Sequence, residues 1–118
     1  MRIGIGIEVG ANLDETLENF RKAEADGFSS AWLSNIFGFD AITLSALAAR
    51  VTSSIEIGTF VVPTYPRHPV AIAQQALTTS AAAGPGRFTL GIGLSHRVVI
   101  EDMFGLDYSK PVRHMREY

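Results

Sequence analysis

The sequence predicts an α/β fold with a parallel sheet, because short apolar segments alternate with amphipathic ones along its 118 residues. Four such pairs succeed one another at a spacing of about 25 to 35 residues, which is typical of consecutive βαβ units with right-handed crossovers. No linker or low-complexity segment separates them, so we expect a single domain over residues 1–118. Four parallel strands fit an open doubly wound sheet or half of an eight-stranded barrel, and the alternation alone leaves both open.

The first unit opens with RIGIGI, residues 2–7, a short apolar segment that suits a buried strand. Asn12 stands three residues before Glu15, a spacing typical of a capping box at a helix start. Apolar side chains then follow one helix face as far as Gly27, which predicts the end of the helix.

The second unit pairs the apolar segment SSAWLSN, residues 29–35, with a helix that Asp40 can cap. The helix face predicted to be buried comprises Leu44, Leu47, Ala48 and Val51. In the third unit, β-branched residues dominate the strand IEIGTFVV at residues 55–62. Pro69 can occupy the first turn of the next helix, and the segment AGPG at residues 83–86 ends it.

The fourth unit begins with the strand RFTLGIGL at residues 87–94. A short helix over residues 98–105 and the start of another at residues 110–118 follow it. Glycines occupy alternate positions in the first and fourth strands, so that one face of each strand has no side chains there. These glycines are Gly4, Gly6, Gly91 and Gly93. They either relieve crowding inside a barrel or let a ligand approach the backbone, and the sequence does not decide between these roles.

Charge and composition exclude several classes of function. Ten Lys and Arg against twelve Asp and Glu give a net charge of −2, and neither sign forms a block, so we expect no nucleic-acid or membrane partner. The chain has no cysteine, which excludes a disulfide framework. It has no apolar run of the roughly 18 residues that a membrane span needs and no pattern of a secretion signal, so we expect a cytoplasmic protein.

Polar residues follow the predicted third and fourth strands, at the edge where parallel α/β proteins bind ligands. Arg67 can pair with a phosphate or carboxylate group. Ser95 and His96 offer a hydroxyl and an imidazole, and an imidazole can exchange a proton near neutral pH. Structural interpretations compete with these: a solvated loop for Arg67 and His68, and a helix cap for Ser95 beside a surface histidine.

Two other kinds of site are disfavoured by the sequence. GIGIEVG, residues 4–10, has part of the pattern of a dinucleotide-binding turn, but Val9 stands where the third glycine is needed. The three histidines lack the close spacing of metal ligands, so no metal site is predicted.

Three segments carry a family resemblance: WLSNIFGFDA at residues 32–41, IGTFVVPTYPRHPVAIAQQALT at residues 57–78, and GRFTLGIGLSHRVVIEDMFGLDYSKPVRHMREY at residues 86–118. In this order they resemble the luciferase-like monooxygenase superfamily, and within it the coenzyme F420-dependent oxidoreductases. The resemblance extends over essentially the whole chain. The ordered set of segments is more specific than any one of them.

The resemblance implies a (β/α)8 TIM barrel that holds a deazaflavin or flavin at the carboxyl ends of its strands. It also implies hydride transfer between that cofactor and a small organic substrate. The third strand would carry a bulge with a non-prolyl cis peptide bond between Phe60 and Val61, behind the ring. The residues implied at the cofactor are Asn35, Phe60, Val61, Arg67, Gly93, Leu94 and Ser95.

His96 and the segment after the second strand differ from the pattern of the resembling family. His96 stands where some relatives have an acidic proton donor, which makes it the expected catalytic acid. Many relatives have an acidic residue and a histidine after the second strand, where this chain has Asn35 and Ile36. The amide of Asn35 can hydrogen-bond to the ring but cannot act as a general base.

Length sets the remaining expectations. A complete barrel takes about 250 residues, so we expect the chain to be the N-terminal half of a barrel, truncated in its fourth helix. Such a half would form a homo-oligomer or be completed by a second half-barrel. Two alternatives to the F420-dependent oxidoreductase stay open: an FMN-dependent monooxygenase of the same superfamily, and a non-catalytic half-barrel module or pairing partner.

Overall fold

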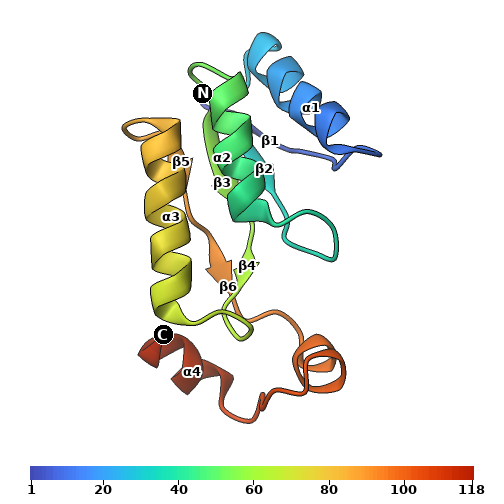
Figure 1. The fold of residues 1–118 in the computed structure, drawn as a ribbon, viewed down its shortest axis with the longest axis vertical. Coiled ribbons are helices and arrows are strands. Elements are labelled where there is room, and N and C mark those ends of the chain that lie inside the picture. Colours follow the sequence, from blue (N-terminus) through green and yellow to red (C-terminus); the bar gives the residue numbers. More distant parts are fainter.

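A four-stranded parallel sheet in the order β1–β2–β3–β5 forms the centre of the fold (Figure 1), and the computed structural model describes all of residues 1–118. Its strands are β1 (Gly4–Gly6), β2 (Ser30–Leu33), β3 (Glu56–Thr59) and β5 (Phe88–Thr89). Helices α1 (Leu13–Ala25), α2 (Ala41–Val51) and α3 (Pro69–Ala83) connect them. Because neighbours in the sheet are also neighbours in the chain, the predicted series of parallel βα units is confirmed.

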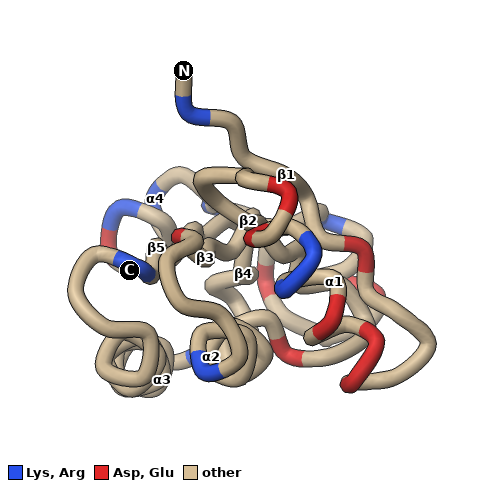
Figure 2. The backbone as a smooth tube through the Cα atoms, turned by 90° about the horizontal axis from the view of Figure 1, so that it is seen from above, with Lys and Arg blue, Asp and Glu red and all other residues tan.

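The three connecting helices lie on one side of the row of strands (Figures 1 and 2). A doubly wound sheet would carry helices on both faces, whereas a barrel carries them only outside. Of the two architectures that the sequence left open, the fold is therefore the half-barrel. None of the helices combines the length and the apolar composition that a membrane span requires.

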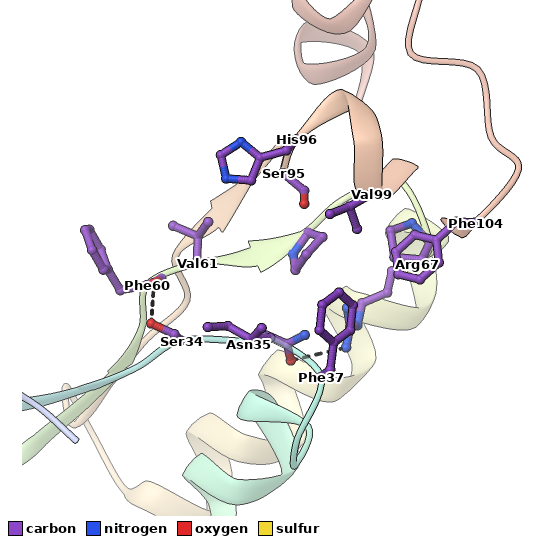
Figure 3. A pocket seen from close by; sticks show the side chains of 13 residues that line it. Ser34, Asn35, Phe37, Phe60, Val61, Arg67, Ser95, His96, Val99 and Phe104 are labelled. Carbon is purple, nitrogen blue, oxygen red and sulfur yellow. Dashed lines mark hydrogen bonds between the residues drawn. The ribbon is translucent and has the colours of Figure 1, made fainter. Parts of the chain in front are cut away.

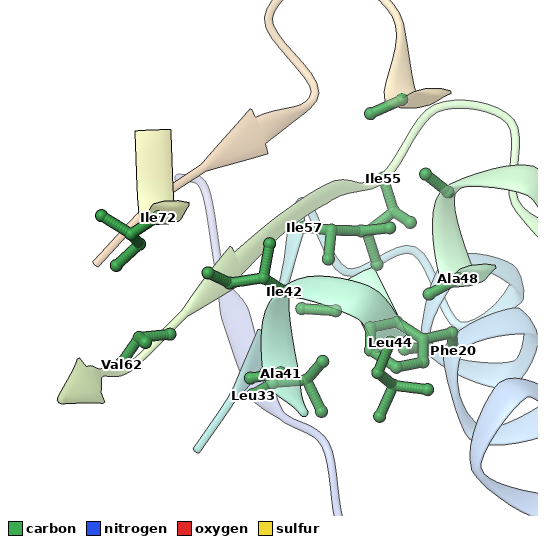
Figure 4. Packing of buried hydrophobic residues seen from close by; sticks show 14 residues of the cluster. Phe20, Leu33, Ala41, Ile42, Leu44, Ala48, Ile55, Ile57, Val62 and Ile72 are labelled. Carbon is green, nitrogen blue, oxygen red and sulfur yellow. The ribbon is translucent and has the colours of Figure 1, made fainter. Parts of the chain in front are cut away.

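The hydrophobic core fills the space between the sheet and these helices (Figure 4). Its largest side chains with almost no exposed surface are Phe20, Leu33, Ile42, Leu44, Ile57 and Val62. Two expectations about burial are wrong. Leu47 is 40% exposed because α2 turns Ile42 and Ser45 inward instead, and β1 is largely exposed because it forms an outer edge of the sheet.

Local signals in the sequence place the helix ends correctly. The side chain of Asn12 accepts a hydrogen bond from the Glu15 N–H, and that of Asp40 accepts one from the Thr43 N–H. Pro69 occupies the first turn of α3, and Gly84 follows its last residue. These side chains and turns satisfy N–H groups that have no partner inside a helix.

The predicted third and fourth strands are each interrupted. β3 is followed by a short strand β4 (Val62–Pro63), and β5 by β6 (Ile92–Gly93); β4 and β6 pair with each other in parallel. The predicted cis peptide bond lies between Phe60 and Val61, at the break in the third strand. The Thr59 hydroxyl bridges the two breaks, since it lies 2.9 Å from both the N–H and the C=O of Gly91.

The C-terminal segment returns beneath the carboxyl ends of the strands (Figure 1). The short helix expected over residues 98–105 is a π-helix, η1 (Val99–Met103), and the chain leaves it at Gly105 in a left-handed conformation with φ of 66°. The last helix, α4 (Pro111–Glu117), lies where the sequence predicts it.

At the opposite end of the sheet, two charged side chains hold the loop between α2 and β3. The Glu24 carboxylate accepts hydrogen bonds from the N–H groups of Ser53, Ser54 and Ile55. The Arg87 guanidinium donates to carbonyl groups of the same loop, at Thr52 and Ile55. The loop is thus bound through its donors on one side and its acceptors on the other.

Candidate functional site

A cavity of about 750 Å³ opens at the carboxyl ends of β2, β4 and β6 (Figure 3). Its wall combines the segment after β2, the junction of β3 and β4, the loop before α3 and the turn before η1. The lining residues are Ser34, Asn35, Ile36, Phe37, Phe60, Val61, Pro63, Pro66, Arg67, Ser95, His96, Val99 and Phe104. Six of the eight residues that the sequence singled out therefore lie on one cavity: Asn35, Phe60, Val61, Arg67, Ser95 and His96.

The cavity wall is largely apolar and open to a ligand. Phe60 is 71% exposed and Phe37 66% exposed, although aromatic side chains of this size are usually buried in a folded domain. Ile36 and Phe104 add further exposed apolar surface to the same wall. An exposed apolar patch that lines a cavity is typical of a ligand-binding site.

Asn35 and Arg67 form the polar corner of the cavity. The side-chain oxygen of Asn35 accepts a hydrogen bond of 3.0 Å from the Ala41 N–H, which leaves its NH₂ group free to donate to a ligand. Arg67 forms an ion pair of 2.6 Å with Asp40. The sequence left open whether Arg67 lies on a solvated loop; it is instead partly buried in this pair.

The same corner is electrostatically fixed by Asp40. Burial tends to raise the pKa of this carboxyl group, but hydrogen bonds from the N–H and hydroxyl of Thr43 and from Arg67 outweigh it and lower the pKa. Asp40 therefore stays ionised and neutralises part of the Arg67 charge. The guanidinium keeps further N–H donors for an anionic group, but as part of a pair rather than as an isolated cation.

Ser95 and His96 occupy the opposite rim, directly after β6 (Figure 3). Ser95 is the one residue other than glycine with a left-handed backbone, at φ of 63°. His96 is exposed, and no side chain of the protein hydrogen-bonds to its imidazole ring. The backbone C=O of His96 accepts bonds of 3.0 Å from the N–H groups of Val99 and Ile100, so the start of η1 holds the residue in place.

Gly93 and Leu94 are the two singled-out residues that do not line the cavity. A Cβ atom at Gly93 would collide with the side chain of Val61, and one at Gly91 with the carbonyl oxygen of Thr59. Gly4 makes room for the Trp32 indole in the same way. Relief of crowding therefore explains Gly4, Gly91 and Gly93, beside which protein atoms occupy the space, but not Gly6, where no atom lies within 4 Å of the position of a Cβ.

His68 has a structural role that the sequence analysis did not predict. Its ring Nδ1 accepts a hydrogen bond of 3.2 Å from the Val70 N–H and so caps α3. His68 does not line the cavity. Of the adjacent pair at residues 67 and 68, only the arginine belongs to the candidate site.

A stack of aromatic rings that reaches the cavity rim through Tyr108 and Ser95 was not predicted. Tyr65 lies between Tyr108, at 5.1 Å between ring centres, and His114, at 3.9 Å and nearly parallel. Burial raises the pKa of both Tyr65 and Tyr118, the tyrosine beyond His114. The sequence shows these tyrosines and the histidine within the segments at residues 57–78 and 86–118. It does not predict the stack, because the stacked rings come from residues far apart in the chain.

Comparison with known proteins identifies the family. The model of the luciferase-like monooxygenase family matches residues 1–118. A Mycobacterium tuberculosis protein provisionally named a coenzyme F420-dependent oxidoreductase is 36% identical over 96 residues, which are 81% of this chain and 27% of that protein. An uncharacterised protein of Mycobacterium bovis is 32% identical over 95 residues. The chain spans about a quarter of the length of these curated relatives, 27% in each case.

Solved structures share the fold at lower identity. The coenzyme F420-dependent tetrahydromethanopterin reductase of Methanopyrus kandleri superposes with a TM-score of 0.78 at 24% identity, over 98% of this chain and 38% of that one. The oxygenating constituent of 3,6-diketocamphane monooxygenase of Pseudomonas putida, in complex with FMN, gives 0.83 at 21% identity, over 99% and 37%. The half-barrel thus corresponds to less than half of each of these two structures. With the family model matching from end to end, the chain belongs to the luciferase-like monooxygenase family.

Proposed function

We propose that this chain forms part of the cofactor pocket of an F420-dependent oxidoreductase that transfers a hydride between the deazaflavin and a small organic substrate. The observation that carries the proposal is the cavity at the strand ends. It brings together residues from three separate βα units: Asn35, Phe60, Val61, Arg67, Ser95 and His96. Ligands of barrel enzymes bind at this end of the strands.

The residues of the cavity fit a flat, mostly apolar ring with a polar edge. Its volume of about 750 Å³ lies within the range of roughly 300–1,000 Å³ for small-molecule pockets. Phe60 and Val61 offer an apolar surface on one side, and the free NH₂ group of Asn35 offers a donor on the other. Arg67 would bind an anionic part of the cofactor with the donors that Asp40 leaves free.

When bound, the deazaflavin supplies the hydride chemistry. The chain's own residues bind it, orient it and supply a proton. Reduction of a carbonyl substrate places the hydride with its electron pair on carbon, and the oxygen then takes a proton. His96 would donate that proton from a ring nitrogen, because its imidazole lines the cavity and is free of protein partners. Ser95 would hydrogen-bond to the ring edge through its hydroxyl group.

F420 is proposed over FMN because the Mycobacterium tuberculosis relative at 36% identity is provisionally named for F420. Solved structures with the same fold include an F420-dependent enzyme and an enzyme in complex with FMN, so binding of FMN is the main alternative. The second alternative is a non-catalytic module that binds neither cofactor.

Titration of the protein with F420 and, separately, with FMN tests the proposal. We expect saturable binding of F420 and weaker or no binding of FMN, measured by the change in cofactor fluorescence. Tight binding of FMN with no binding of F420 would contradict the proposal and support an FMN-dependent monooxygenase of the same family. A folded protein that binds neither cofactor and associates with itself would support the non-catalytic module.

His96→Ala belongs to the same experiment, with His68→Ala as its matched control. We expect His96→Ala to retain F420 affinity and to lower turnover by about 10²-fold or more, the usual contribution of general acid catalysis. His68→Ala removes a histidine outside the cavity and should leave turnover unchanged. Equal turnover in the wild type and His96→Ala would remove His96 from the acid role.

A further inference from the structure

We infer that Tyr108 is a positioning residue of the cavity, and that its hydroxyl group fixes the peptide that joins Ser95 to His96. The hydroxyl donates a hydrogen bond of 3.1 Å to the Ser95 carbonyl oxygen. That carbonyl belongs to the peptide plane through which His96 is attached. Holding it therefore sets the direction in which both rim side chains leave the backbone.

The backbone at this rim needs such a restraint. A left-handed conformation at a residue with a side chain is sparsely populated, and it persists only where surrounding structure enforces it. Tyr108 restrains the peptide before His96, and the N–H groups of Val99 and Ile100 restrain the peptide after it. With both peptides held, only the imidazole of His96 remains free to respond to a ligand.

Tyr108 is itself held by its ring. It stacks on Tyr65 with 5.1 Å between ring centres and 30° between planes, and the guanidinium carbon of Arg97 lies 5.4 Å from its centre. Glu101 fixes Arg97 through an ion pair of 2.8 Å. The Tyr108 hydroxyl is thus presented from a packed ring, which makes its hydrogen bond a directional restraint rather than a loose surface contact.

The two stacked tyrosines differ in one way that makes a controlled experiment possible. The Tyr108 hydroxyl has the Ser95 carbonyl as its partner, whereas the buried Tyr65 hydroxyl has no hydrogen-bond partner. Tyr108→Phe therefore removes the proposed restraint, and Tyr65→Phe removes an equal hydroxyl group from the same stack without removing a bond.

The first readout is the NMR signal of the ligand-free protein, which is independent of any cofactor. We expect the carbonyl ¹³C shift of Ser95 and the amide signal of His96 to move in Tyr108→Phe and to stay at their wild-type positions in Tyr65→Phe. Unchanged signals in Tyr108→Phe would overturn the inference. Equal changes in both variants would overturn it too, because they would assign the effect to ring packing.

The second readout rests on the proposed function. Loss of one neutral hydrogen bond that orients the rim should lower kcat about fivefold to tenfold, with F420 affinity changed less than about twofold. Tyr65→Phe should keep wild-type kcat. Wild-type kcat in Tyr108→Phe, despite a shifted Ser95 carbonyl signal, would overturn the positioning role in catalysis. If the wild type binds no cofactor, the proposed function fails, and the carbonyl shift still decides whether Tyr108 fixes this peptide.

Discussion

At the scale of single residues, a contact between Thr59 and Gly91 joins the breaks in the third and fourth strands. The Thr59 hydroxyl donates a hydrogen bond to the Gly91 C=O and accepts one from the Gly91 N–H, each of 2.9 Å, although the residues lie 32 positions apart. The Thr59 carbonyl oxygen occupies the space where a Cβ of residue 91 would stand. This close approach brings the Phe60–Val61 segment to the cavity wall.

Gly91→Ala should therefore destabilise the protein. Its methyl group would collide with backbone rather than with a movable side-chain end, and such overpacking typically costs about 1–3 kcal/mol. Gly6→Ala is the matched control, because no atom lies within 4 Å of the position its Cβ would take. Urea unfolding followed by the fluorescence of the single tryptophan measures both. Equal stability of the two variants would contradict the account of Gly91.

At the scale of elements, α1 is tied to the distant β3 through the loop at residues 52–55. Glu24, near the end of α1, accepts the N–H groups of three successive residues of this loop. Burial tends to raise the pKa of Glu24, but these bonds outweigh it and lower the pKa from 4.5 to about 2. The folded state thus prefers the ionised carboxylate more strongly than the unfolded state does.

This preference predicts the pH dependence of stability. The contribution of Glu24 is complete above its unfolded pKa of 4.5 and is lost as the pH falls toward the folded pKa of about 2. Because the Glu24 side chain is only partly buried and solvent screens its bonds, Glu24→Gln should cost only about 1 kcal/mol at pH 7. It should also flatten the decline of the unfolding free energy between pH 4.5 and 2. Glu18→Gln, which removes only an exposed pair with Arg21, is the control.

Should Glu24→Gln unfold with the same steep pH dependence as the wild type, the loop would not be held by this carboxylate. The measurement is a series of urea unfolding curves across the acidic range, compared with the same series for Glu18→Gln.

The sequence predicts those elements whose signals are local. Asn12, Asp40 and Pro69 mark helix starts through bonds or geometry within a few residues, and all three are confirmed. The division of the third and fourth strands was not predicted apart from the bulge at Phe60–Val61, because it involves contacts between residues far apart in the chain, such as Thr59 and Gly91.

The candidate site divides in the same way. The position of a residue after a strand was enough to predict that Arg67 and His96 lie on one cavity, since the carboxyl ends of parallel strands meet at one edge. Asn35 was placed there by the family resemblance. The pairing of Arg67 with Asp40 and the bond from Tyr108 to Ser95 could not be predicted. Both depend on the side-chain packing of segments distant in the sequence.

At the scale of the whole molecule, the half-barrel leaves two sheet edges open. β1 pairs only with β2, and β5 only with β3, so each presents unpaired backbone groups on its outer side. Helices α1, α2 and α3 lie on only one side of this sheet (Figure 2). We propose that residues 1–118 form one partial barrel domain, completed by further βα units or by a second half-barrel, since open edges favour pairing with another strand.

The central claim is that the strand-end cavity binds the cofactor ring. A crystal structure of the protein with F420 bound tests this most directly. We expect the ring to lie against Phe60 and Val61, with Asn35 and His96 within hydrogen-bond distance of its polar edge or of the substrate beside it. A ring bound elsewhere, with Phe60 and Val61 still exposed, would contradict this claim.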